Sequence, residues 1–206
     1  MSYKSRISLV ALMLSFCVLG CHTGYKKIDG EWSYVTWDEG HGRRVHTLTV
    51  DNSTFSILKN KAYAKDKDHV FYKGKIIPDA DPASYSVLKK EFFAKDKNHV
   101  FLFYYKLEGA NPETFTELKF PYGRDDQRVF CGTIPMNVHH IDAFKVVKAS
   151  KSYATLGKDI FMESNAPDFN FLDTLQADMV IHSWDALAKT DSQYFEDYKE
   201  VKAPGK

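Results

Sequence analysis

The chain has 206 residues, enough for one domain or one array of small repeats with a sizeable core. Hydrophobic residues make up 44% and charged residues 27%, as in ordinary folded proteins, and the 15% of aromatic residues favours strands. Without Lys4 and Arg6, which lie in a segment that we expect to be removed, 26 basic residues face 27 acidic ones, a net charge of −1. That balance excludes a strongly basic nucleic-acid-binding protein.

The N-terminal segment predicts export. A short basic start precedes an apolar stretch, residues 7–19, which has the length of the hydrophobic region of a secretory signal. The stretch ends in Val18-Leu-Gly-Cys21, which resembles the lipobox of bacterial lipoproteins. The resemblance implies cleavage after Gly20 and acylation of the Cys21 sulfur. The alternatives are an ordinary signal peptide with a chance cysteine, and a buried N-terminal helix.

These features predict a signal peptide at 1–20, a tether at 21–27 and a β-repeat domain at 28–206. Membrane attachment is expected through lipid on Cys21, because several acyl chains anchor a protein stably. His22 stands where Asp would indicate retention at the inner membrane. We therefore expect a bacterial cell-envelope protein, at the outer membrane of a Gram-negative host, facing the periplasm or the surface.

The cysteine count predicts no internal disulfide. Cys17 leaves with the signal and Cys21 is acylated, so Cys131 is the one free thiol of the mature chain. Cys131 lies in a strand-like segment, and we interpret it as a small buried apolar residue rather than a reactive thiol.

Residues 32–37 and 45–50 are rich in β-forming residues, and the segment between them carries Gly40 and Gly42. Glycine supplies the positive φ angles that tight turns need, so this region predicts a β-hairpin. The hairpin is expected to cap the repeats that follow, because terminal units of repeat proteins are atypical.

A 30-residue period organises the rest of the chain. The phrase Tyr63-Ala-Lys-Asp-Lys-Asp-His-Val-Phe-Tyr72 returns at 93–102, and a second phrase recurs at 51–58, 81–88 and 111–118. Such periods mark arrays in which each unit packs against its neighbours. We expect units at 51–80, 81–110 and 111–140, and a fourth at 144–161.

Each unit predicts strands on both sides of a tight turn, at 66–69 and again at 96–99, where Asp and Asn suit the turn conformation. The predicted fold class is therefore all-β, with repeated antiparallel hairpin or meander units of about 30 residues forming one array, clearest over 51–161. Beyond Pro167 the pattern fades. There 169–184 predicts two more strands, and 185–199 a short helix or an irregular cap.

The residues that keep the period are the predicted core. An apolar spine is expected from Phe55, Tyr85 and Phe115, with Leu58, Leu88 and Leu118. A second set consists of three Val-Phe pairs, of which one member should face inward: Val70-Phe71, Val100-Phe101 and Val129-Phe130.

Two stretches carry a family resemblance. Ala64-Lys-Asp-Lys-Asp-His-Val-Phe-Tyr72 and Ala80-Asp-Pro-Ala-Ser-Tyr85 resemble the DKNYY family of bacterial repeat proteins, most clearly over 51–130. The resemblance implies repeats and a cell-envelope setting. It assigns no biochemical activity and transfers no catalytic residue.

The turns also suggest metal binding, because oxygen and nitrogen ligands recur in them: Asp66, Asp68 and His69, then Asp96, Asn98 and His99. A calcium loop of the EF-hand type needs a ligand at its fifth position and glycine at its sixth, where this chain has Val70 and Phe71. We therefore favour turn chemistry, and expect no metal and no cofactor.

Two other polar groups have simple interpretations. His139 and His140, near Asp142, point to opposite faces of a strand and are better read as exposed polar residues than as a zinc site. Eight lysines recur beside aromatics and predict either a basic face for an anionic glycan or nucleic acid or, as we favour, a solvated strand face. They are Lys59, Lys61, Lys65, Lys67, Lys89, Lys90, Lys95 and Lys97.

The sequence carries no nucleophile elbow, no paired-carboxylate motif and no Walker A pattern. It therefore predicts no catalytic residue, and the ligand-binding residues are left open. The favoured function is a non-catalytic binding or scaffold module for an envelope protein or glycan, without nucleic acid as a partner. The alternative is an envelope hydrolase whose site forms between repeats.

Overall fold

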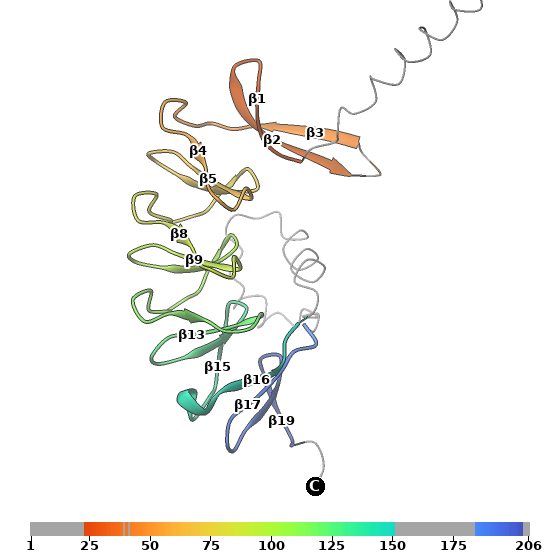
Figure 1. The fold of residues 1–206 in the computed structure, drawn as a ribbon, viewed down its shortest axis with the longest axis vertical. Coiled ribbons are helices and arrows are strands. Elements are labelled where there is room, and N and C mark those ends of the chain that lie inside the picture. Colours follow the sequence, from red (N-terminus) through yellow and green to blue (C-terminus); the bar gives the residue numbers. More distant parts are fainter. Residues whose placement is uncertain (1–22, 39, 41, 151–183, 204–206) are drawn as a thin grey trace, which may run out of the picture.

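The structure is a computed structural model that describes residues 23–38, 40, 42–150 and 184–203. In these ranges it contains nineteen strands and one short 3-10 helix, η1 (Ile141–Ala143). The strands form five small antiparallel sheets, in each of which the strands follow one another in sequence order. Figure 1 shows the sheets one below another in a single column. The predicted all-β array of repeated meanders is confirmed.

The first sheet caps the column at the N-terminal end. It consists of β1 (Gly24–Ile28), β2 (Glu31–Asp38) and β3 (Gly42–Thr47), with β2 in the middle. The hairpin predicted from 32–37 and 45–50 is present, although its second strand begins and ends earlier. The tether predicted at 21–27 overlaps β1. There Tyr25 is buried, and its hydroxyl donates to the Ala62 carbonyl at 3.2 Å and accepts the Gly74 N–H at 3.0 Å.

The next three sheets correspond to the predicted units. The second contains β4 (Ser56–Ile57), β5 (Tyr63–Lys65), β6 (Val70–Tyr72) and β7 (Lys75–Ile76). The third contains β8 (Ser86–Val87), β9 (Phe93–Lys95), β10 (Val100–Leu102) and β11 (Tyr105–Lys106). The fourth contains β12 (Thr116–Glu117), β13 (Tyr122–Arg124), β14 (Val129–Cys131) and β15 (Ile134–Met136). The predicted turns at 66–69 and 96–99 join equivalent strands, β5 to β6 and β9 to β10.

The fifth sheet joins two distant segments. It contains β16 (Lys145–Lys148), β17 (Leu187–Lys189), β18 (Tyr194–Glu196) and β19 (Lys199–Val201). The helix or irregular cap expected at 185–199 is wrong, because Ala186, Ala188 and Phe195 are buried in a strand pattern. Residues 151–161 of the expected fourth unit, and residues 169–183 of the two expected strands, lie outside the described residues.

The core lies between the sheets, so each middle sheet is covered on both faces. In the second sheet Ala64 and Phe71 are directly opposite each other and pack toward the first sheet, whereas Val70 packs toward the third. Both members of all three Val-Phe pairs are therefore buried. The expectation that only one member of each pair faces inward is wrong, because it assumed that one face of each sheet is exposed to solvent.

Two residues of the predicted spine, Tyr85 and Phe115, each contact rings of two neighbouring sheets. The Tyr85 ring centroid lies 6.1 Å from that of Tyr63 in the preceding sheet and 5.7 Å from that of Phe101 in its own. Phe115 repeats the arrangement with Phe93 at 5.2 Å and Phe130 at 6.2 Å. Phe144 repeats it with Tyr122 at 5.4 Å and Phe195 at 5.9 Å. Tyr85 and Phe115 are buried, whereas Phe55 and the three leucines of the spine are half-buried.

Candidate functional surface

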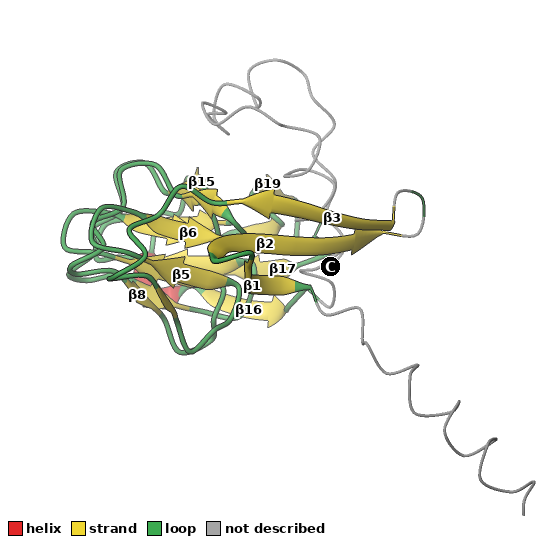
Figure 2. Cartoon of the chain, turned by 90° about the horizontal axis from the view of Figure 1, so that it is seen from above, coloured by secondary structure: helices red, strands yellow, loops and turns green. Residues whose placement is uncertain are grey.

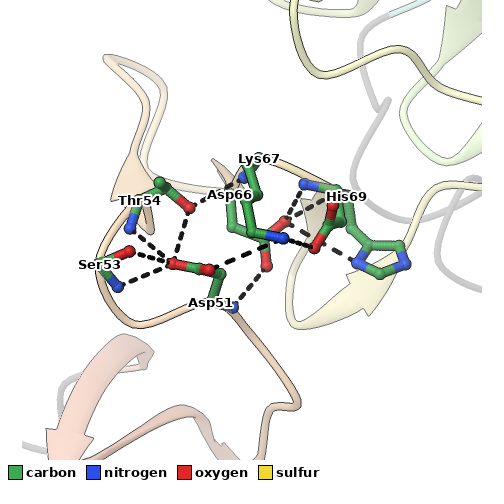
Figure 3. A network of polar contacts seen from close by, with 7 residues as sticks. Asp51, Ser53, Thr54, Asp66, Lys67 and His69 are labelled. Carbon is green, nitrogen blue, oxygen red and sulfur yellow. Dashed lines mark hydrogen bonds and ion pairs between the residues drawn. The ribbon is translucent and has the colours of Figure 1, made fainter.

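The turn at 66–69 is built around one buried carboxylate (Figure 3). Asp66 Oδ1 accepts the backbone N–H groups of Asp68 at 2.8 Å and His69 at 2.6 Å. Its Oδ2 accepts the backbone N–H of Asp51 at 2.9 Å. Burial by itself would raise the pKa of Asp66, but these three N–H donors outweigh it and lower the pKa below the ordinary 3.8. Asp66 is a structural anion with its oxygens already engaged.

The same geometry recurs in the next two sheets. Asp96 accepts the N–H groups of Asn98 at 2.7 Å, His99 at 2.6 Å and Asp81 at 2.8 Å. Asp125 accepts those of Gln127 at 2.8 Å, Arg128 at 2.6 Å and Asn111 at 2.9 Å. In the fifth sheet Thr190 replaces the aspartate, and its hydroxyl accepts the N–H of Gln193 at 3.0 Å.

A second loop packs beside each of these turns. Asp51 Oδ1 accepts the N–H groups of Ser53 at 3.0 Å and Thr54 at 3.1 Å, and the Thr54 hydroxyl accepts the N–H of Lys67 at 3.0 Å. Ser84 accepts the N–H of Lys97 in the same way, at 3.0 Å. The two recurring sequence phrases of a unit are thus tied together by side chains, which fixes the backbone that presents the turn.

Two of the eight recurring lysines, Lys65 and Lys95, link neighbouring sheets. Lys65 Nζ donates to the Pro82 carbonyl at 2.7 Å, and Lys95 Nζ donates to that of Pro112 at 2.6 Å. Arg124 takes this role in the fourth sheet and donates to the Ile141 carbonyl at 2.9 Å. Each bond joins a strand to the first loop of the following unit. These cations are therefore engaged in holding the array together.

We call the side chains that follow the capping aspartates the turn surface; all are exposed except His99, which is half-buried: Lys67, Asp68, His69, Lys97, Asn98, His99, Asp126, Gln127 and Arg128. The side chains of Lys67 and Lys97 are 55% and 65% exposed, and their Nζ atoms lie 3.8 Å from Asp51 and 3.3 Å from Asp81. The turn surface thus carries both signs of charge, with Lys67 and Lys97 at the position that Asp126 takes in the fourth sheet. It suits a polar partner with a repeating or extended surface.

The metal hypothesis finds no support in the turns. In the described part of the chain no group of three His, Cys, Asp or Glu side chains is placed to hold an ion. His69 Nδ1 lies 3.8 Å from Asp66 Oδ1, whose lone pairs already accept backbone N–H groups. Turn chemistry explains these residues.

The two adjacent histidines are exposed, and each contacts the fifth sheet. The His139 backbone N–H donates to Gln193 Oε1 at 2.8 Å. His140 Nδ1 lies 2.9 Å from both Asp191 carboxylate oxygens, and its hydrogen bond lowers the pKa of Asp191. Asp142 instead lies 3.4 Å from Arg124. The histidines therefore belong to two separate contacts.

Cys131 is fully buried in β14, as predicted. Burial, and to a lesser degree the nearby Asp197 carboxylate, raises the pKa of its thiol well above the ordinary value. A thiol held neutral and away from solvent is a poor nucleophile. The sequence-predicted lipidation residue, Cys21, lies outside the described residues.

The sequence did not predict the buried polar residues that hold the fifth sheet in place at the C-terminal end of the array. Buried Asp197 accepts the N–H groups of Trp184 and Ala186, both at 3.0 Å, and buried Gln193 donates to the Asn137 carbonyl at 3.1 Å. A signal was present, since Ala188-Lys189 and Tyr194-Phe195 repeat the spacing of Ala-Lys and Val-Phe in the earlier units. This copy of the spacing is displaced from the 30-residue period, and Thr190 takes the place of the capping aspartate.

These features define a protein made of stacked antiparallel β-meanders, and in the second, third and fourth sheets a carboxylate caps the turn between the two middle strands. The sequence model of the DKNYY family matches residues 29–165. The chain therefore belongs to the DKNYY family. No curated protein and no solved structure matches it. Within the described residues, no helix has the length and hydrophobicity to cross a membrane.

Proposed function

We propose that this chain is a lipid-anchored cell-envelope protein whose stacked sheets present the turn surface to an envelope protein or glycan, without catalysis. The anchor is supported by the basic start, the apolar stretch 7–19 and the Val18-Leu-Gly-Cys21 ending. Acyl chains on Cys21 hold the protein at the membrane, facing the periplasm or the surface. The outer membrane is the proposed location because His22, and not the Asp that would indicate inner-membrane retention, follows Cys21.

The observation that carries the binding role is the repetition of exposed groups on fixed backbone. Buried Asp66, Asp96 and Asp125 hold three equivalent turns in one conformation. The side chains that these turns expose are not needed for the cap, since the cap uses backbone N–H groups. Preorganised groups lose little entropy on binding, so a repeated turn favours an extended polar partner.

Exchange of the cysteine tests the anchor. Cys21→Ser removes the sulfur that would carry lipid, so the protein is expected to leave the membrane fraction or to remain as an uncleaved precursor. Cys17→Ser is the matched control, because Cys17 lies within the removed segment and its loss should change neither processing nor fractionation. Normal processing and membrane fractionation of Cys21→Ser would refute the anchor.

Two double variants test the turn surface. Lys67→Gln/Lys97→Gln removes two exposed charges from equivalent turns. Lys59→Gln/Lys89→Gln removes the same charge from exposed lysines in the loops that precede β5 and β9, whereas the turns follow these strands. Each protein is tested for retention of detergent-extracted envelope proteins and for co-sedimentation with purified cell-wall glycan. We expect reduced retention of the partner in the first pair only; equal retention by both pairs would contradict the assignment.

A further inference from the structure

The outer face of the first sheet carries exposed apolar and basic side chains. Tyr34 packs toward the second sheet, so the alternation of a strand places Val35 and Trp37 on the opposite face, where Val35 is buried and Trp37 is exposed. Cross-strand pairing puts Val45 beside Val35 and Arg43 beside Trp37 on that face. Trp37 is 51% exposed and Val45 is 42% exposed. We call Trp37, Val45 and Arg43 the end patch.

The end patch lies where the chain enters the fold. Gly24, the first residue of β1, pairs with Val35 next to the patch. Two residues lie between Cys21 and Gly24, so their Cα atoms are three steps of the chain apart, a maximum span of about 10 Å. A lipid on Cys21 would therefore bring the bilayer within about 10 Å of the sheet edge that carries the patch.

The chemistry of the patch suits that position. Tryptophan prefers the boundary between headgroups and acyl chains, because its ring is apolar and its N–H is polar. Arg43, and Lys26 opposite Ser33 on the same face, carry charges that attract anionic headgroups. Glu31 is the one described acidic side chain on this face, and it lies at the far end of β2 from Trp37.

We propose that the end patch rests on the lipid surface to which Cys21 is anchored, with Trp37 at headgroup level. This inference rests on the proposed lipid anchor. It adds an orientation: the column stands on its first sheet, and the fifth sheet lies farthest from the bilayer (Figure 1). Figure 2 shows β2 and β3 extending beyond the smaller sheets.

Tryptophan fluorescence of the full-length, lipidated protein tests the orientation in vesicles that contain phosphatidylglycerol and brominated phospholipid. The chain has three tryptophans; Trp184 is buried and Trp32 is half-buried on the inner face of the first sheet. We expect bromine to quench the emission of the native protein, and Trp37→Phe to abolish that quenching. As a matched control, Val147→Trp in the Trp37→Phe protein places the reporter at a 59% exposed position of the fifth sheet. It should not be quenched.

Flotation of the same samples separates the two proposals. A protein that fails to float with the vesicles overturns the lipid anchor, and this inference with it. A protein that floats but shows no quenching at Trp37, or equal quenching at residue 147, overturns the orientation alone. Disulfide-linked dimers of Val45→Cys on the vesicles would also overturn it, because a second copy would then cover the patch.

Discussion

The carboxylate of Asp66 accepts the backbone N–H of Asp51, 2.9 Å away and fifteen residues earlier in the chain. Asp96 holds Asp81 in the same way at 2.8 Å, and Asp125 holds Asn111 at 2.9 Å. One side chain thus closes a turn and fixes the first loop of its own unit. The aspartate in the repeated phrase is explained by folding, whereas the exposed side chains beside it take no part in the cap.

Loss of a capping carboxylate should be costly. Asp96→Ala leaves three backbone N–H donors without an acceptor and is expected to lower the free energy of unfolding by about 3 kcal/mol. Asn98→Ala, in the same turn but exposed, should change it by less than about 0.5 kcal/mol. Urea denaturation of both variants checks this prediction. Similar losses would mean that the cap does not hold the turn.

The sequence predicted the sheets that share a strict period, because equivalent residues there meet equivalent neighbours. The turns at 66–69 and 96–99 and the burial of Tyr85 and Phe115 belong to this part. It did not predict the fifth sheet, since β16 pairs with β17 across a long insertion that breaks the period. Nor did it show that Lys65 and Lys95 bond to the next sheet, because such contacts depend on stacking rather than on spacing within a unit.

Acid should weaken the cap formed by Asp66. The pKa of Asp66 is lower in the folded chain than its ordinary value of 3.8, so the unfolded chain binds the proton more readily. The stabilisation is present above the unfolded pKa and is lost as the pH falls through the folded pKa. The stability difference between the native protein and Asp66→Asn should therefore be constant near pH 7 and shrink below about pH 4.

Urea denaturation of both proteins across this pH range measures the difference directly. Asp68→Asn is the control, because its exposed carboxylate lies outside the buried cap. If the difference in the free energy of unfolding between the native protein and Asp66→Asn grew as the pH fell, the ionised carboxylate would not stabilise the fold. That result would contradict the cap.

Two buried tyrosine hydroxyls should be dispensable. Within the part of the chain that the structure describes, the buried hydroxyls of Tyr63 and Tyr85 have no hydrogen-bond partner, whereas that of Tyr122 donates to the Asp197 carbonyl at 2.9 Å. Removing an unsatisfied polar atom relieves a desolvation cost, so Tyr85→Phe should leave stability unchanged or raise it by up to about 1 kcal/mol. Tyr122→Phe should lower it by about 1 kcal/mol. Thermal unfolding compares the two, and a loss in Tyr85→Phe as large as that in Tyr122→Phe would reveal an unseen partner.

The rings themselves should matter far more than the turn histidines. Tyr85 is 6% exposed and lies against Tyr63 and Phe101, so Tyr85→Ala opens a cavity between the second and third sheets. We expect it to lower the free energy of unfolding by about 3–5 kcal/mol, the range for deleting a buried aromatic side chain. His69→Ala should cost less than about 1 kcal/mol, because its side chain is 45% exposed and the cap uses only its backbone N–H. Thermal unfolding compares the stability losses of the two variants. A larger loss from His69→Ala would mean that the histidine side chain, and not the buried Tyr85 ring, holds the sheets together.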